Sequence, residues 1–338
     1  MHTLLLDSDD VRANAPMGQL ISAVEDAFGA YQRGDAQMPA KSYIDLQEYN
    51  GDFRSMPAYL NVRAESSEAD DAWDAAGVKW VNVHPDNRAD HDLPTVLGTM
   101  IYSDPETAIP LAIMDGRELT MLRTGAAAAV ATDYLAVEGA TSLGIVGAGV
   151  QSYTQLDAIA AVRPIEEVVI ADADAKRAAD FVEAFADRFE IRAGSTAEAA
   201  ACDVLSTVTP VESPIVDRAA VGDHTHINAI GADAAGKQEL DAEILREATL
   251  VIDDYEQTTH SGEINVPYSE GTLTDADIHA SIGEIVVGRA GGRPPVDGIT
   301  VFDSTGLAIQ DVAAAHVVYT RAKEQGNGTP FDLLGLAD

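Results

Sequence analysis

The order of apolar and polar positions changes at about residue 142. Before that point, residues 17–33 carry apolar side chains at helical spacing, which predicts an amphipathic helix, and the alanine-rich residues 119–136 predict another. Short β-like runs lie between these helices, separated by turn-rich polar segments, and they predict an antiparallel or mixed sheet. These runs are residues 41–46, 53–60, 76–84, 95–103 and 110–116.

After residue 142, short apolar strands alternate with helical stretches. Such alternation predicts βαβ units and a parallel sheet. The final segment, residues 299–326, predicts one more strand and a long helix, and we expect that helix to return to the first domain. The predicted strands of this half are residues 142–147, 166–172, 202–209, 225–231 and 249–254.

The charge balance is strongly acidic, with 56 Asp and Glu against 21 Lys and Arg and a formal net charge of -35 over 338 residues. The acids are spread along the chain, so they predict a solvated surface and not an acidic tail. Such a surface repels itself at low salt, whereas molar salt shortens screening to about 3 Å. We therefore expect a protein of a halophile's salt-rich cytoplasm. Nucleic acid is excluded as a partner because binding it needs a basic footprint.

The sequence predicts neither a membrane span, a leader nor a metal centre. No run approaches 18 apolar residues, and the first residues carry acid where a signal peptide carries base. Cys202 is the only cysteine, which excludes an internal disulfide and a CxxC zinc site. His224 and His226 lack a third ligand at suitable spacing. A cytoplasmic location without membrane contact is the expectation.

A glycine-rich turn carries the strongest chemical signal. A predicted strand leads into Gly147 and Gly149 and then into a helix, with Ser152 at the third small position. The first glycine permits a tight turn, the second lets a pyrophosphate approach the backbone, and the helix N-terminus attracts it. Asp172 ends the next strand, where an acid accepts hydrogen bonds from ribose hydroxyls and repels a 2′-phosphate. This arrangement favours NAD; the alternatives are a cofactor-free glycine turn and an Asp172 without a binding role.

Six segments together resemble the ornithine cyclodeaminase/mu-crystallin family, which also contains the archaeal alanine dehydrogenases, and these are the closest in character. The segments are MPAYL, GVKWVNVHPDN, LTMLRTGAAAAVATDYLA, GIVGAGVQ, INAIGADAAGKQELD and VFDSTGLAIQD. The resemblance implies an α/β fold with a Rossmann-type parallel-sheet domain that binds NAD, over residues 123–304. It also implies a discontinuous α+β domain for substrate binding and dimerisation, over residues 1–122 and 305–338. The expected assembly is a homodimer whose N-terminal domains join in a closed β structure.

The resemblance also assigns roles to individual residues. Lys79 and Arg123 would bind the carboxylate or amine region of the substrate, Lys79 would take part in catalysis, and Asp233 would donate or accept the proton. Thr305 would touch substrate, and Lys41 falls near a carboxylate-binding cation. The implied cofactor contacts are Thr95, Arg123, Gly147, Gly149, Val150, Gln151, Asp172, Thr207, Val208, Ile227, Asn228, Ala229, Ile230, Lys237 and Ser304.

These residue types suit the oxidation of an amino acid. Its carboxylate must be held so that the Cα hydride faces the nicotinamide, and the fork of an arginine holds a carboxylate with two hydrogen bonds. Asp233 beside a lysine can act as a general acid and base, because each group shifts the pKa of the other. The alternatives are an Arg123–Asp233 structural ion pair, a strand-edge Lys79 and an ordinary Lys41.

Arg54 discriminates between the reactions of the family. Ornithine cyclodeaminases carry a glutamate just before the Met-Pro pair, where this chain has Arg54. An arginine there opposes the distal ammonium of ornithine, since two like charges about 4 Å apart cost roughly 4 kcal/mol at a dielectric constant near 20. We therefore expect NAD-dependent conversion of L-alanine through iminopyruvate to pyruvate and ammonia, in either direction. The alternatives are an ornithine cyclodeaminase, a ketimine reductase and a nicotinamide-dependent binding protein without catalysis; Lys79 and Asp233 argue against the last.

Overall fold

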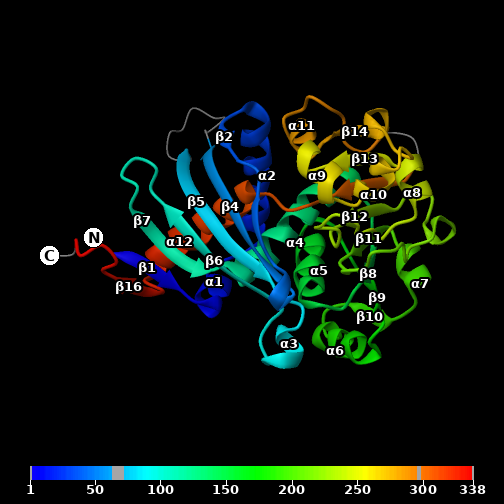
Figure 1. Ribbon diagram of the computed structural model, residues 1–338. Helices are drawn as coiled ribbons and strands as arrows, with labels where there is room; N and C mark the ends of the chain where they lie inside the picture. The colour runs from blue at the N-terminus through cyan, green and yellow to red at the C-terminus, as the bar shows by residue number, and fades with distance from the viewer. Residues whose placement is uncertain (1, 63–71, 295–297, 337–338) are drawn as a thin grey trace. The chain divides into compact units, whose positions relative to one another are not determined.

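The computed structural model describes residues 2–62, 72–294 and 298–336. The chain forms two compact units (Figure 1). Unit 1 is Met1–Arg123 with Leu307–Asp338, and unit 2 is Thr124–Gly306.

The first boundary between the units follows Arg123, and the second follows Gly306. Arg123 belongs to unit 1, where its guanidinium bonds to Gln310 and Asp311 in the C-terminal segment. Thr305 belongs to unit 2, because its backbone N–H donates to Asp253 at 2.7 Å.

Unit 1 is built on a mixed sheet, sheet A, with the order β16-β1-β7-β6-β5-β4-β2 and with β3 paired to β4. β1 runs parallel to β7, and the other pairs are antiparallel. The strands are β1 Thr3–Leu6, β2 Ala36–Gln37, β3 Ser42–Leu46, β4 Gly51–Val62, β5 Trp73–Val83, β6 Val96–Ser103, β7 Pro110–Asp115 and β16 Thr329–Phe331.

Two long helices form the core of unit 1 with this sheet. α2 (Met17–Arg33) buries Leu20, Val24 and Phe28 on one face, which confirms the amphipathic pattern, and it ends at Gly34 in the left-handed region. α12 (Ala308–Gln325) packs against α2 and against β4, β5 and β6 (Figure 1). The remaining helices that begin in this unit are α1 Ser8–Ala13, η1 Gln47–Tyr49, α3 Asn87–Asp90 and α4 Gly116–Leu135, which continues into unit 2.

A row of long side chains crosses the inner face of sheet A. Met56 of β4 pairs with Lys79 of β5, Lys79 pairs with Met100 of β6, and Met100 pairs with Met114 of β7. All four side chains are buried. Directly paired residues share a face of the sheet, so Lys79 is the one charged member of a methionine row. An ammonium in such surroundings needs hydrogen-bond partners of its own.

Unit 2 is built on a parallel sheet, sheet B, with the order β10-β9-β8-β11-β12-β15-β13-β14. Every pair is parallel, as the alternation of strands and helices predicted. The strands are β8 Ser142–Val146, β9 Glu167–Ala171, β10 Glu190–Ala193, β11 Val204–Thr207, β12 His226–Ala229, β13 Thr249–Ile252, β14 Ile278–Ser281 and β15 Thr300–Asp303.

Successive residues along the strands of sheet B pack into two separate hydrophobic cores. Ile145 and Val168 belong to one core, and Val146 and Val169 belong to the other. The strand order reverses at β8, which has β9 on one side and β11 on the other, and ligands bind at such switch points. The Rossmann-type prediction is confirmed. The helices that begin in unit 2 are α5 Val150–Val162, α6 Ala175–Phe185, α7 Thr196–Ala200, η3 Arg218–Ala220, α8 Ala242–Glu247, α9 Tyr255–Ser261, α10 Asn265–Ser269, η4 Asp275–Asp277 and α11 Ile282–Val286.

Within the described ranges, no helix has both the length and the apolar character that crossing a membrane requires.

Candidate functional site

Three charged side chains meet in the interior of unit 1. Asp311 of α12 accepts hydrogen bonds at one oxygen, Oδ1, from Lys79 Nζ at 2.8 Å and from Arg123 Nε at 3.0 Å. Lys79 also donates to Thr120 Oγ1 at 3.1 Å, and Arg123 Nη1 donates to Gln310 Oε1 at 2.8 Å. We call Lys79, Arg123 and Asp311 the cation cluster. With two cations against one carboxylate, it favours the approach of an anion.

Burial tunes the lysine of this cluster. Lys79 is 1% exposed, and its burial lowers the pKa of the ammonium from 10.5 to about 7. The charge and hydrogen bond of Asp311 oppose this fall, while the charges of Arg123 and Lys41 add to it. An amine with a pKa near 7 can give up or take a proton at neutral pH.

Two atoms beside this cluster lack hydrogen-bond partners within the described residues: Asp311 Oδ2 and Gln310 Nε2, both buried. Buried polar groups are normally satisfied, so such atoms mark a place where a polar ligand would complete the bonding. The sequence pattern did not single out Asp311. Its signal was an acid inside the mostly apolar run AIQDVAAAHVV, in a chain where acid is common everywhere.

Arg54 lies on the same face of sheet A as Lys79. It lies in β4 two positions before Met56, whose partner on β5 is Lys79. Asp52 accepts from the Arg54 guanidinium at 3.1 and 2.9 Å, and the guanidinium lies over the Tyr43 ring, 5.6 Å from its centroid. These contacts fix the guanidinium and cancel part of its charge.

Three predicted site residues of unit 1 lie on or beside strands of sheet A or near Lys79. Lys79 lies on the central strand β5, which excludes a position at the sheet edge. Lys41 is near enough to Lys79 to lower its pKa. Thr95 precedes β6, and its carbonyl accepts from the backbone N–H of His84 at 2.8 Å.

The glycine-rich turn of unit 2 follows β8 directly. Gly147 has φ +104°, a conformation that disfavours other residues, and Gly149 precedes α5. A side chain at Gly149 would meet nothing within 4 Å, so open space lies over the N-terminus of this 13-residue helix. The turn therefore fits a pyrophosphate by both backbone conformation and space.

Asp172 lies against this turn. Its Oδ2 accepts from the backbone N–H of Ala148 at 2.6 Å, and its Oδ1 accepts from that of Asp174 at 2.7 Å. The carboxylate is thus held beside the glycines at the end of β9, which suits a contact with a ribose. Val150 and Gln151 begin α5.

Asp233 lies in the loop after β12 and forms an ion pair with Lys237, at 2.5 Å between Oδ1 and Nζ. Arg123, the partner that the sequence offered as an alternative, forms its ion pair with Asp311 of unit 1. The pair Asp233–Lys237 is partly exposed, which leaves it able to exchange protons with a ligand or with water.

Most of the remaining predicted site residues lie at or just after the carboxyl ends of strands in sheet B, where ligands of such sheets bind. Thr207 ends β11 and Val208 follows it, whereas Ile227, Asn228 and Ala229 lie inside β12 with wholly buried side chains, and Ile230 follows. Asn228 donates to Thr132 at 3.0 Å. Ser304 and Thr305 both donate to Asp253.

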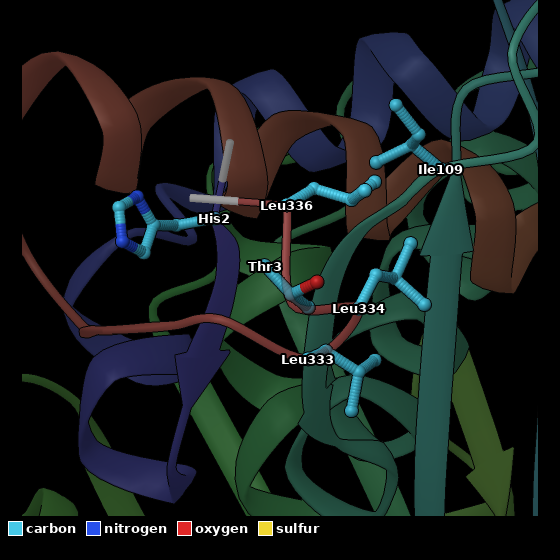
Figure 2. Close-up of a pocket in the computed structure, with 6 residues that line it drawn as sticks. All are labelled: His2, Thr3, Ile109, Leu333, Leu334 and Leu336. Atoms are coloured by element: carbon cyan, nitrogen blue, oxygen red, sulfur yellow. The ribbon is translucent and has the colours of Figure 1, made fainter. Parts of the chain in front are cut away.

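The part of the chain that the structure describes contains no group of three or more His, Cys, Asp or Glu arranged to hold a metal ion. A pocket of unit 1 near the two ends of the chain is apolar (Figure 2). Its described lining offers no carboxylate, lysine or arginine to bind an amino acid. The lining residues are His2, Thr3, Ile109, Leu333, Leu334 and Leu336.

These features define an α/β protein with a dinucleotide-type glycine turn at the switch point of one sheet and a buried cation cluster on a second sheet. The family model described as "Ornithine cyclodeaminase/mu-crystallin family" matches residues 1–326. The chain belongs to this family, as the sequence segments indicated.

Relatives of this family differ in the reactions that their names state. The chain is 46% identical over 330 residues to the alanine dehydrogenase of Archaeoglobus fulgidus, covering 97% of this chain and 98% of the relative. It is 33% identical over 335 residues to the L-lysine cyclodeaminase of Streptomyces rapamycinicus, covering 94% and 92%.

Solved structures repeat this pattern. An archaeal alanine dehydrogenase dimer with bound NAD is 45% identical, has a TM-score of 0.91 and covers 99% of this chain and 100% of its own. The Thermococcus litoralis Δ1-pyrroline-2-carboxylate reductase, solved with NADH and L-proline, is 37% identical, has a TM-score of 0.90 and covers 97% and 99%.

Proposed function

We propose that this protein oxidises L-alanine to pyruvate and ammonia with NAD, and reverses the reaction when pyruvate and ammonia are supplied. Family membership makes the chain an NAD-dependent enzyme. The observation that carries the choice of substrate is Arg54, held by Asp52 on the face of sheet A that also bears Lys79. The likeness to alanine dehydrogenases supports the same choice.

The residues of unit 2 fit NAD. Gly147 and Gly149 give the turn and the open space that a pyrophosphate needs, and Asp172 is held where a ribose hydroxyl would donate to it. When bound, NAD supplies the hydride acceptor of the reaction.

The cation cluster would bind the alanine carboxylate. Arg123 uses Nε and Nη1 within the cluster, and in the described part of the chain no hydrogen bond involves its Nη2. Arg123 Nη2 and the charged form of Lys79 would hold the carboxylate and orient Cα. The neutral form of Lys79, with a pKa of about 7, can accept the proton that the substrate amine must lose.

Asp233 would carry the proton transfers at the imine. Its ion pair with Lys237 orients the carboxylate, which would accept a proton from the attacking water and return it to the departing ammonia. Thr305 and Ser304, held by Asp253, lie at the carboxyl end of β15 and would complete the polar surroundings.

A ketimine reductase is the second candidate, because the Thermococcus litoralis reductase has nearly the same TM-score and was solved with L-proline. Both reactions pass hydride between a nicotinamide and an imine carbon, so the same residues serve each. A cyclodeaminase, as in the lysine enzyme of Streptomyces rapamycinicus, is less compatible with Arg54, which opposes a distal ammonium.

A second copy of the chain is the partner that we propose. Trp80 of β5 is 41% exposed and Ile101 of β6 is 37% exposed, and both lie on the face of sheet A opposite Lys79. Phe53 stacks on Trp80 at 5.3 Å between ring centroids. Exposed aromatic side chains on a strongly acidic protein favour an interface, and the related archaeal structure is a dimer. The proposed setting is a salt-rich cytoplasm.

One panel assay tests the substrate. The pure protein is incubated in molar KCl with amino acids or with cyclic imines, and NADH and ammonia are measured together. Alanine is expected to produce NADH and ammonia in equal amounts. Ornithine turned over with ammonia but without net NADH would establish a cyclodeaminase, and consumption of NADH with a cyclic imine alone would establish the reductase.

A further inference from the structure

Three carboxylates of unit 2 are completely buried. Glu239 and Glu263 lie in loops, and Asp303 ends β15; each is 0% exposed. We call them the carboxylate series. Among the residues that the structure describes, no cation is paired with any of the three. Each accepts hydrogen bonds from backbone N–H groups, which satisfy a buried carboxylate.

Each member of the series holds the backbone of the next. Asp303 accepts from the N–H groups of Glu263 and Ile264, at 2.8 and 3.0 Å. Glu263 Oε1 accepts from the N–H groups of Glu239 and Leu240, at 2.8 and 2.6 Å. The order Asp303, Glu263, Glu239 thus leads from β15 toward the loops that follow β11 and β12.

Glu239 ties those two loops together. Its Oε1 accepts from the N–H and the hydroxyl of Thr209, both at 2.7 Å, and its Oε2 accepts from the N–H of Gly231 at 2.9 Å. Thr209 reaches the cofactor turn, since a Cβ at Gly147 would lie 3.0 Å from its Cγ2. Gly231 begins the loop that carries Asp233.

Two glycines make room for the carboxylate series. A Cβ at Gly262 would lie 2.7 and 2.8 Å from the oxygens of Asp303, and one at Gly231 would lie 2.5 Å from Glu239 Oε2. Real Cβ atoms essentially never approach another atom this closely, so both positions need glycine. Burial raises the pKa of Glu239, and raises that of Glu263 and Asp303 well above its ordinary value, while the N–H donors oppose this rise.

The Asp233 loop is held at a second place by the same segment. Asn265, two residues after Glu263, accepts from the N–H of Gly236 at 2.9 Å and donates to the carbonyl of Lys237 at 2.8 Å. The ion pair of Lys237 with Asp233 therefore lies on a loop that is held at three places. Gly231 is bonded to Glu239, the backbone of Glu239 is bonded to Glu263, and residues 236 and 237 are bonded to Asn265.

We propose that Glu239 is a positioning residue, which Glu263 and Asp303 hold in place and which fixes the Asp233 loop relative to the glycine turn of the cofactor site. This inference rests on the proposed function. Displacing a reacting group by about 1 Å can cost 10²-fold in rate, so a residue that touches neither substrate nor cofactor can control both binding and turnover.

The three side chains predict unequal effects of isosteric amides. Both oxygens of Glu239 and both of Asp303 accept from backbone, so an amide would point an N–H group at another donor. In Glu263, Oε1 alone accepts two bonds, at 2.6 and 2.8 Å, and the Oε2 contact is longer at 3.1 Å. Glu263→Gln should therefore cause a smaller loss than Glu239→Gln, although each replaces a buried carboxyl group with an amide.

The experiment compares these variants with Glu243→Gln, an exposed site four residues from Glu239. NADH affinity is measured by fluorescence titration, and kcat and KM by alanine oxidation, all in molar KCl. We expect Glu239→Gln and Asp303→Asn to weaken NADH binding about tenfold and to lower kcat about tenfold or more. KM for alanine should stay within about twofold, because the cation cluster belongs to unit 1.

Two results would overturn the proposal: Glu239→Gln equal to Glu243→Gln in NADH affinity and kcat, or Glu263→Gln as damaging as Glu239→Gln. If Glu239→Gln does not fold, Thr209→Val, which deletes one hydroxyl donor, is expected to weaken NADH binding about threefold, and no change would refute the idea. An unmutated protein without NADH binding or alanine turnover would instead refute the proposed function.

Discussion

Lys79→Met tests the physical role of the buried lysine directly. Methionine suits the position because Met56 and Met100 are the paired neighbours of Lys79 on either side. Asp311 keeps its bond to Arg123 in this variant. The substitution thus removes one ionisable group from an apolar row with little change of volume.

The magnitude follows from the pKa of Lys79. Between pH 7 and 10.5 the unfolded chain still binds the proton that the folded chain has released, so the free energy of unfolding must rise with pH. A fall from 10.5 to about 7 corresponds to a total rise on the order of 5 kcal/mol, at most about 1.4 kcal/mol per pH unit. Lys79→Met should lack this contribution.

Urea unfolding in molar KCl at several pH values between 7 and 10 measures the effect. The chain has two tryptophans, Trp73 and Trp80, and both lie on β5, so their fluorescence reports the unfolding of unit 1. Lys176→Met, at a side chain 80% exposed, is the matched control and should keep the slope of the unmutated protein. If the free energy of unfolding rises equally steeply with pH in Lys79→Met and in the unmutated protein, the reasoning is refuted. Alanine oxidation should fall about 10²-fold or more in Lys79→Met.

Three further outcomes are expected. NADH should bind at least about tenfold more tightly than NADPH because of Asp172, and Asp172→Ser should narrow that ratio; equal affinities of the unmutated protein in a titration would contradict this role. The midpoint of thermal unfolding should rise between dilute buffer and molar KCl, since 35 net negative charges repel one another; a midpoint independent of salt would contradict a halophilic surface. Arg54→Glu should lower kcat/KM for alanine at least about tenfold and raise that for ornithine relative to it; loss of alanine activity without any gain for ornithine would show that Arg54 binds the carboxylate.

The pattern of the sequence was sufficient for elements whose signal is local. Residue type and context predict the glycine turn at residues 147–149. The spacing of apolar residues predicts the helix over residues 17–33. Strands β1 and β16 were not predicted. Each is only three or four residues long, and each pairs with strands from a distant part of the chain. Leu5 of β1, for example, pairs with Ile113 and with Thr329.

The buried acids could not be predicted for a different reason. In a chain with 56 acidic residues, an aspartate or glutamate carries almost no information about burial. Asp311 and Glu239 look like the surface acids around them, and only the fold shows that both are 0% exposed. The glycine before Glu263 was the available local hint, because it leaves room for Asp303.

The pairing of the first and last strands has a consequence for how the protein is made. Residues 124–306 of unit 2 are contiguous, so a ribosome releases all of that unit before α12 exists. Sheet A can be completed only after Phe331, the partner of Thr3, has emerged. Lys79 likewise has no Asp311 to accept its hydrogen bond until α12 has emerged. Unit 2 can therefore fold first, whereas sheet A of unit 1 must wait until Phe331 has emerged.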